Sequence, residues 1–324
     1  MTAGRAMLWR GVGLVFVLAS LGFLGWQVAR DWDEITAAAT QVSGWLLVAS
    51  FAAAALGLGC TALAWRTLLG GLGSRLPVRD AGQVFFLSQI GKYLPGSVWP
   101  YLAQARLGKD LGVPVARSAS AGVTFVLLHL LTGLVLGMPR VLLGDELDRR
   151  FVLALWTLPV LAVVLHPAVL RRLTAVAGRV LRVEVPPTRL PWGALLVAVA
   201  WLLGAWVLYG VSLAALVGPF ETLTPASLGL LTSSYALAWS VGFLGAALVV
   251  VAAPAGLGFR EVALFATLSG VVPSSAAALV VLLSRVLMTL ADLGWAVLAG
   301  ARGGLRRRAS DVAAGSAGTG AEGP

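Results

Sequence analysis

Residues 192–217 read WGALLVAVAWLLGAWVLYGVSLAALV, a run of 26 residues without a charged side chain. An α-helix rises about 1.5 Å per residue, so about 20 apolar residues cross the hydrocarbon core of a bilayer. Residues 44–65 form a second uncharged run of similar length. A membrane β-barrel would instead show alternating segments of about ten residues. Both runs therefore predict transmembrane helices.

The composition of the whole chain agrees with a membrane protein. The 324 residues are 59% hydrophobic and 12% charged, and the mean hydropathy is +0.90. A soluble domain carries about 25% charged residues, and it could not bury this much apolar surface. Because lipid offers no hydrogen bonds to the backbone, the chain must form helices or a closed barrel. We predict an all-α, polytopic transmembrane helix bundle, with residues 1–308 in one domain.

The apolar segments, taken in order, suggest the number of spans. They are residues 9–29, 44–65, 82–103, 119–138, 151–166, 192–217, 229–253, 257–273 and 275–299. Three of them are doubtful as independent spans. Residues 82–103 contain Lys92 and two prolines, while 229–253 and 257–273 are joined by Pro254-Ala255-Gly256 with no polar loop. We therefore predict six to eight spans, with one or two re-entrant hairpins that are broken by proline and glycine.

Lysine and arginine in short loops mark the cytoplasmic face of a membrane protein. Seventeen of the 24 basic residues lie in loops that we assign to that face: Arg5, Arg10, Arg66, Arg75, Arg79, Arg106, Lys109, Arg117, Arg171, Arg172, Arg179, Arg182, Arg189, Arg302, Arg306, Arg307 and Arg308. The opposite loops hold only four basic residues, Arg30, Arg140, Arg149 and Arg150, and seven acids: Asp31, Asp33, Glu34, Asp145, Glu146, Asp148 and Glu221. Both termini are therefore predicted to be cytoplasmic, in the inner membrane of a bacterial cell. Residues 309–324 are predicted to be a disordered tail. The net charge of +10 resides largely in these loops and does not predict nucleic-acid binding.

The same charge pattern constrains the doubtful segments. Basic loops flank residues 82–103, so this segment must enter and leave the membrane at the cytoplasmic face. Between Glu221 and the basic C-terminal block the number of crossings must be odd. Either 229–253 and 257–273 form a re-entrant hairpin that opens outward and 275–299 crosses, or all three segments cross. We favour the first arrangement, because paired hairpins of opposite orientation are typical of transporters with a binding site between them.

The stretch GKYLPGSVWP, residues 91–100, carries the first helix break. Proline lacks an N–H and glycine tolerates a positive φ, so Pro95 and Gly96 interrupt any helix here. In lipid such a break survives only where protein or a wet cavity satisfies the freed carbonyls. Lys92 lies one turn earlier, and a charge at membrane depth costs about 3 kcal/mol unless it is paired or hydrated. Lys92 is either a lysine that snorkels to the interface or a cation that faces a lipid phosphate.

The stretch APAGLGFREVAL, residues 253–264, carries the second break, at Pro254, Gly256 and Gly258. Arg260 and Glu261 then stand in the first turn of the next helix. The helix dipole favours an acid at that position, so Glu261 could serve only as a cap. The same dipole disfavours Arg260, which therefore needs a partner or water.

The last apolar segment contains two more charges, Arg285 near its middle and Asp292 two turns farther along the same face. Glu261 is the obvious counter-ion of Arg285, in a pair that is either structural or functional. Charged residues inside membrane spans mark transport pathways. We predict that a lipid headgroup binds to Lys92, Tyr93, Arg260, Glu261 and Arg285. Glu261 and Asp292 are the candidate proton sites.

The two broken stretches resemble the signature motifs of the lysylphosphatidylglycerol synthase transmembrane-region family, integral membrane proteins of bacteria and archaea. This family includes the flippase half of the multiple-peptide-resistance proteins. The first motif, R/K-Y-hydrophobic-P-G-x-x-W, is carried by Lys92, Tyr93, Leu94, Pro95, Gly96 and Trp99. The second motif, P-x-G-hydrophobic-G-x-R-E, is carried by Pro254, Gly256, Leu257, Gly258, Arg260 and Glu261. Arg285 is similar to a membrane arginine of the family, and the resemblance covers nearly the whole chain.

Two features depart from the family pattern. Family members often carry an acid in the helix after the first motif, where this chain has His129. We interpret His129 as a packed residue. The full-length synthases append a large soluble aminoacyl-transferase domain, which nothing in this chain resembles. The resemblance therefore implies the transport half of such a protein without the lipid-modifying half.

These observations predict a lipid flippase or transporter that binds an anionic or phosphate-bearing headgroup at a mid-membrane site. No nucleotide-binding loop occurs, so the movement is expected to be passive or ion-coupled. An enzyme is not predicted, because His129 and His166 lie far apart and no metal or cofactor motif is present. The alternative is a non-catalytic membrane accessory subunit for a separately encoded glycosyl- or aminoacyl-transferase. The oligomeric state does not follow from the sequence.

Overall fold

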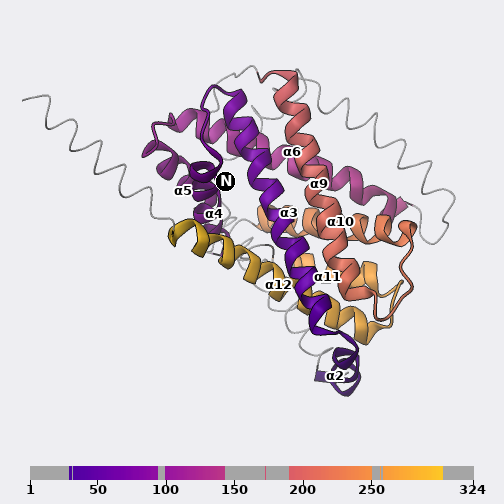
Figure 1. Cartoon of the computed structure of the whole chain (residues 1–324). Coiled ribbons are helices and arrows are strands. Elements are labelled where there is room, and N and C mark those ends of the chain that lie inside the picture. Colours follow the sequence, from indigo (N-terminus) through magenta and orange to yellow (C-terminus); the bar gives the residue numbers. More distant parts are fainter. Residues whose placement is uncertain are drawn as a thin grey trace, which may run out of the picture.

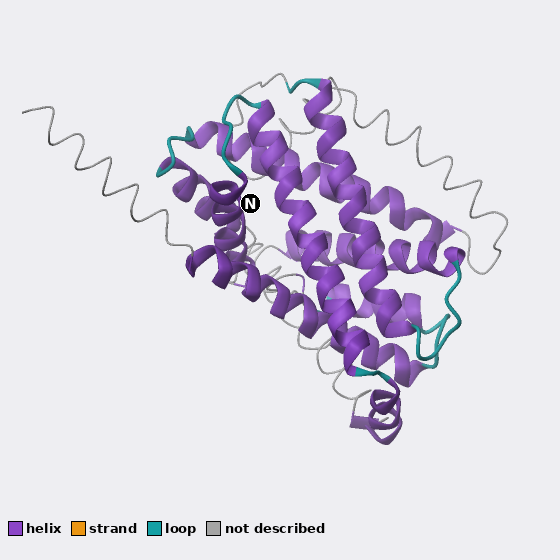
Figure 2. Ribbon diagram, viewed as in Figure 1, coloured by secondary structure: helices purple, strands orange, loops and turns teal. Residues whose placement is uncertain are grey.

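The chain folds into helices throughout the part that a computed structural model describes, which is residues 29–30, 32–93, 99–142, 172, 190–249, 256 and 258–301. Figure 2 shows these helices and the described loops. Within the described residues every element is helical, so the predicted all-α fold is confirmed. The predicted span 151–166, nearly all of the predicted span 9–29, and the predicted tail 309–324 lie outside these residues.

Five described helices are long and apolar enough to cross a membrane. They are α3 (Gly44–Gly71), α6 (Val115–Leu142), α9 (Trp192–Val217), α10 (Pro225–Val249) and α12 (Ser274–Ala301). Because water is absent from the hydrocarbon core, each of these helices satisfies its backbone hydrogen bonds internally. The protein is therefore a multi-pass membrane protein.

Helices α3 and α9 lie side by side along their lengths (Figure 1). They run antiparallel, because Ser50 near the start of α3 hydrogen-bonds Ser212 near the end of α9 at 2.9 Å. Gly57 permits the close approach, since a Cβ there would lie 2.5 Å from the ring of Tyr209. Small residues at helix contacts allow this kind of packing in a membrane, where the hydrophobic effect does not drive helices together.

The first Pro/Gly-broken stretch joins two short helices. Helix α4 (Val78–Gln89) ends in the 3₁₀ turn η1 (Ile90–Tyr93), and the chain resumes in α5 (Trp99–Lys109), which packs against α4. The 12 residues of α4 cover about 18 Å, which is too short to cross about 30 Å of hydrocarbon. We call α4, η1 and α5 the first hairpin.

The first hairpin opens at the basic end of the bundle, the end where Arg66, Arg75, Arg79, Lys109 and Arg117 lie. Two hydrogen bonds tie the loops together there, from Arg66 Nε to the Leu76 carbonyl at 2.8 Å and from Arg117 Nη1 to the Gly73 carbonyl at 3.2 Å. The last turns of α12 reach the same end, since the Ala299 carbonyl accepts a hydrogen bond from Gln83 of α4 at 3.0 Å.

The second broken stretch lies between α10 and α11 (Phe259–Leu268), which pack together as the second hairpin. This hairpin opens at the opposite, acidic end of the bundle, the end that carries Glu221 and the two acids of α2 (Trp32–Gln41). There α2 packs on the first turns of α12, in a cluster that also contains Phe220 and Phe265 (Figure 1). The ten residues of α11 cover only about 15 Å. α11 alone is therefore too short to cross about 30 Å of hydrocarbon, whereas α10 is long enough to do so.

Candidate functional site

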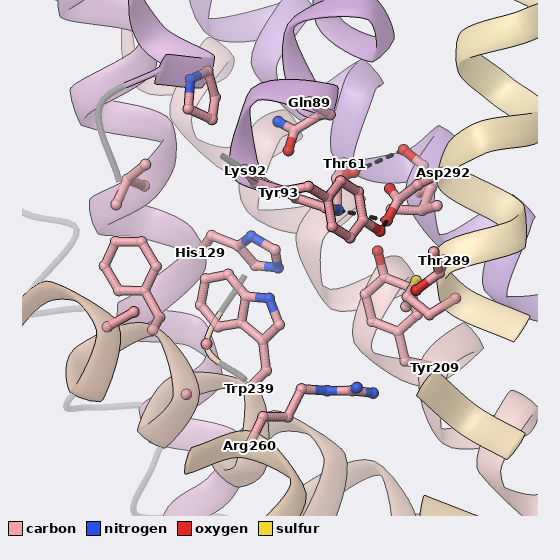
Figure 3. Close-up of a pocket in the computed structure, with 18 of the residues that line it drawn as sticks. Thr61, Gln89, Lys92, Tyr93, His129, Tyr209, Trp239, Arg260, Thr289 and Asp292 are labelled. Carbon is pink, nitrogen blue, oxygen red and sulfur yellow. Dashed lines mark hydrogen bonds and ion pairs between the residues drawn. The ribbon is translucent and has the colours of Figure 1, made fainter. Parts of the chain in front are cut away.

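The inner ends of the two hairpins meet at a cavity of about 200 Å³ (Figure 3). Helices α3, α6, α9 and α12 also line it. A cavity needs only about 10–15 Å³ by this kind of measure to hold one water, so there is room for a polar headgroup together with water. The polar and charged lining residues are Thr61, Gln89, Lys92, Tyr93, Tyr101, His129, Tyr209, Tyr235, Arg260, Arg285, Thr289 and Asp292.

The first hairpin places an ion pair on one side of the cavity. Lys92 Nζ lies 2.6 Å from Asp292 Oδ2, and the Tyr93 hydroxyl donates a hydrogen bond to the same oxygen at 2.8 Å. Figure 3 shows the three side chains together. The Asp292 residue is 6% exposed, so its negative charge is stabilised mainly by these two neighbours. Lys92 therefore lines the cavity and pairs with a carboxylate there.

The second hairpin places Glu261 between a backbone cap and two arginines. Glu261 Oε2 accepts a hydrogen bond from the Gly258 N–H at 2.8 Å, as in a helix capping box. Glu261 Oε1 accepts one from Arg285 Nη1 at 3.1 Å and lies 3.5 Å from Arg260 Nη1. The predicted Glu261–Arg285 pair is therefore confirmed, and Glu261 also serves as the predicted cap.

Arg260 is held by partners from three helices, as its unfavourable place at a helix N-terminus requires. Its Nη2 donates to Ser284 Oγ at 3.1 Å, and its guanidinium carbon lies 5.0 Å from the centre of the Tyr235 ring. The residue is 6% exposed. In Figure 3 the side chain extends from below Trp239 towards the part of the cavity where Tyr209 and Thr289 lie.

Helix α12 connects the two hairpins electrostatically. Arg285 and Asp292 lie on one face of this helix, about 10 Å apart along its axis. Arg285 pairs with Glu261 of the second hairpin, and Asp292 pairs with Lys92 of the first. Each hairpin tip is thus bound to α12 by an ion pair in a setting of low dielectric constant, where such pairs are strong and their loss is costly.

The break residues of the second motif have the backbone that the sequence predicts. Gly256 and Gly258 adopt φ values of +70° and +87°, which residues with a Cβ rarely adopt. Gly256 also lines the cavity. Trp99 of the first motif begins α5 and is 46% exposed. Pro95, Gly96 and Pro254 lie outside the described residues.

Sequence reasoning missed the aromatic wall of the cavity. His129 is packed, as predicted, with its ring 4.7 Å from Trp206 and 4.2 Å from Trp239. It nevertheless lines the cavity, and its Nε2 atom is buried without a hydrogen-bond partner. Tyr209 and Trp239 lie in segments that are apolar on all sides, so no pattern in the sequence could indicate which of their faces turns inward.

A close contact between α10 and α11 sets the position of Arg260. A Cβ on Gly242 would lie 2.8 Å from Arg260 Cβ, whereas one on Gly229, in the same helix, would meet nothing within 4 Å. We expect Gly242→Ala to destabilise the protein by about 1–3 kcal/mol through overpacking. Gly229→Ala is expected to be neutral or slightly stabilising, because alanine favours the helix by up to about 1 kcal/mol. Thermal unfolding of both variants in detergent tests this difference, and equal melting temperatures would contradict the close contact.

A comparison with models of protein families identifies the family of this chain. The family model of the lysylphosphatidylglycerol synthase TM region matches residues 11–295. The chain belongs to this family. The match includes both hairpins and all five of the candidate site residues that were predicted to bind a headgroup. The comparison with curated proteins found no match.

Membership in the lysylphosphatidylglycerol synthase TM-region family fits the helical architecture described above. The matched family model is that of the membrane region, which fits a protein that is not an enzyme. Among the described residues, no group of three or more histidine, cysteine, aspartate or glutamate side chains is arranged to hold a metal ion.

Proposed function

We propose that this protein is a lipid flippase or transporter that binds an anionic or phosphate-bearing headgroup in the cavity between the two hairpins. The observation that carries the proposal is the meeting of two short, broken helices at a cavity lined by Lys92, Arg260 and Arg285. Moving a phospholipid across a bilayer is difficult because the headgroup is polar, while its tails can remain in lipid. Cations and hydrogen-bond donors at mid-membrane depth reduce that difficulty.

The ion pairs suggest how a headgroup would be taken up. A phosphate competes with Asp292 for Lys92, and with Glu261 for Arg285, because all three anions prefer the same cations. Each exchange loosens the contact between one hairpin and α12. A headgroup that arrives from the basic end would first loosen the first hairpin, and one from the acidic end would loosen the second. Glu261 and Asp292 are the carboxylates that could take up a proton if the movement is ion-coupled.

We also propose the membrane in which the protein lies and its orientation there. Both hairpins are re-entrant, the basic end faces the cytoplasm, and the protein lies in the inner membrane of a bacterial cell. The charge of the described residues supports this orientation. The basic end carries Arg66, Arg75, Arg79, Arg106, Lys109 and Arg117 beside Asp80 and Asp110, and the other end carries Asp33, Glu34 and Glu221 beside Arg30 and Arg140. Residues 1–308 form one transmembrane domain, which works without a cofactor and contacts membrane lipids.

The direct test is lipid movement in proteoliposomes that contain acyl-labelled fluorescent phosphatidylglycerol, followed with a membrane-impermeant reductant. Wild-type protein is expected to expose the inner-leaflet lipid to the reductant. Arg285→Gln is expected to slow the movement about tenfold or more, since it removes a charge-assisted contact to the phosphate. Arg75→Gln removes the same charge from an exposed position at the basic end and is expected to leave the rate unchanged.

Other outcomes would contradict a transport role. An unchanged rate in folded Arg285→Gln protein would remove the cavity from the transport path. No movement by folded wild-type protein would favour an accessory subunit for a separately encoded transferase, which tolerates Arg285→Gln as long as it inserts and binds its partner.

A further inference from the structure

A second cavity lies between α3, α4 and α12, and none of its lining residues lines the cavity between the hairpins. Trp295 Nε1 donates to the Ala55 carbonyl at 2.9 Å where α12 contacts α3. Towards the basic end α4 packs against both helices (Figure 1). The cavity has a volume of about 280 Å³. We call it the α4 groove, and its lining includes Gly59, Arg66, Arg79, Gly82, Gln83 and Trp295.

The space in the groove exists because glycine stands at two positions of its wall. A Cβ on Gly59 would lie 3.8 Å from the Trp295 ring, and one on Gly82 would lie 3.9 Å from the Phe86 ring, so both positions have room for a side chain. Small residues in membrane proteins usually bring helices together, but these two leave a gap. Gaps of this size are rare in packed proteins, and an apolar cavity of about 150 Å³ already binds benzene. The groove therefore suits an apolar occupant.

The groove opens towards lipid. Val78 and Leu298 belong to its lining, and both are exposed apolar residues. Two of its three walls, α3 and α12, are long and apolar enough to cross a membrane. Lipid tails are as apolar as leucine, so an acyl chain is the apolar group that surrounds the groove and fits it.

Two arginines line the groove at its basic end. Arg66 Nε donates to the Leu76 carbonyl at 2.8 Å, which orients the guanidinium and uses one of its five N–H donors. Arg79 lies exposed in the first turn of α4, and the neighbouring Asp80 is not part of the lining. Guanidinium groups bind phosphate through paired hydrogen bonds, and basic pockets between spans bind anionic headgroups on the cytoplasmic side. The charge at this end of the groove thus complements a lipid phosphate.

Gln83 provides a second, independent observation. Its side chain lines the groove, and the residue is 3% exposed. Nε2 donates to the Ala299 carbonyl at 3.0 Å, whereas Oε1 has no hydrogen-bond partner among the described residues. Buried polar atoms are nearly always satisfied, and this oxygen can only accept. Gln83 follows Arg79 by four residues, so both lie on one face of α4. A headgroup held at Arg79 can bring a hydroxyl or a bound water to Oε1.

From the open apolar space, the two arginines and Gln83 we infer that the α4 groove binds one anionic phospholipid of the leaflet at the basic end. One acyl chain fills the space beside Gly59 and Gly82. The phosphate lies at Arg66 and Arg79. This lipid stays in the groove and bridges the first hairpin to α3 and α12. The inference does not rest on the proposed function, because it concerns a different site and a lipid that is not moved.

Photolabelling of the full chain in phosphatidylcholine vesicles tests the site. A trace of phosphatidylglycerol that carries a diazirine at the end of one acyl chain is added, and the labelled peptides are identified by mass spectrometry. We expect the label to gather on residues 59–66, 78–86 and 295–299. A phosphatidylcholine probe with the same diazirine should label these residues at least about tenfold less, since each arginine near the surface contributes about fivefold.

Two matched pairs of variants test the space and the charge. Gly59→Leu fills the groove and is expected to lower the labelling of residues 78–86 and 295–299 about tenfold or more. Gly204→Leu makes the same change in α9, where a Cβ meets nothing within 4 Å, and should keep the wild-type labelling. Arg79→Gln is expected to lower the preference for the phosphatidylglycerol probe about fivefold. Lys109→Gln, at an exposed position of the same end, should keep that preference.

Melting temperatures in detergent show that each variant is folded, and Gly82→Leu replaces Gly59→Leu if the latter does not fold. Label spread evenly over the exposed faces of α9 and α12, or unchanged labelling in the folded Gly59→Leu variant, would overturn the inference. Equal labelling by the two probes would overturn it as well. Absence of label from the groove would also overturn it and would leave the groove to a protein segment. Labelling confined to the groove, without lipid movement in the vesicle assay, would support the inference and contradict transport.

Discussion

Glu261→Gln is expected to abolish lipid movement and to lower the free energy of unfolding by about 3–5 kcal/mol. The carboxylate lies between Arg285 Nη1 at 3.1 Å and Arg260 Nη1 at 3.5 Å, so its loss leaves two neighbouring arginines without their shared anion. Glutamine keeps the side-chain size and can still accept from the Gly258 N–H. The loss therefore reports the missing charge rather than the missing cap. Thermal unfolding in detergent and the vesicle assay measure the two effects.

The variants can be matched so that a folding defect does not hide the result. Glu221→Gln removes the same charge from an exposed loop at the acidic end, and we expect no change in stability or in movement. The double variant Glu261→Gln with Arg285→Gln removes both partners of the pair, so it should recover most of the lost stability. It should not recover movement, because a cation at the phosphate position is gone. If stability and lipid movement both recover, the Glu261–Arg285 pair has only a structural role.

The spans could be predicted from the sequence because lipid imposes a length and a composition on any helix that crosses it. The run 192–217 coincides with α9, which lies between Pro191 and Gly218. The predicted span 44–65 was too short, since α3 continues to Gly71. The charge of Arg66 ended the apolar run, but its guanidinium is satisfied at the bundle end by the Leu76 carbonyl.

The candidate site could be predicted in part, because charges in apolar segments are rare and each one needs a reason. Lys92, Arg260, Arg285 and Asp292 line one cavity, and Glu261 pairs beside it. The contacts of Lys92 and Tyr93 with Asp292 could not be predicted. Tyr93 and Asp292 lie 199 residues apart in the sequence, and no local spacing relates them. The contributions of His129, Tyr209 and Trp239 depend on helix rotation, which a uniformly apolar segment does not specify.

Exchanging the charges of Lys92 and Asp292 is expected to restore a function that each single substitution destroys. Lys92→Glu places two carboxylates together, and Asp292→Lys places two ammonium groups together. Like charges at this distance in a buried setting cost several kcal/mol, so each single variant should move lipid at about 1% of the wild-type rate or less. The double variant re-forms an ion pair of reversed direction, and the Tyr93 hydroxyl can accept from a lysine at position 292. We expect its rate to return to about 10% or more.

The exchange also separates two roles for the pair. The double variant keeps the formal charge of the site, whereas the single variants change it by two units in opposite directions. If the pair serves to bind the first hairpin to α12, stability and movement should both recover in the double variant, with a coupling energy of about 2–3 kcal/mol in a double-mutant cycle. Recovery of stability without movement would show that the headgroup needs a cation at position 92 itself. Recovery of neither would contradict the Lys92–Asp292 contact, because a contact of 2.6 Å between two side chains must respond to the reversal of both charges.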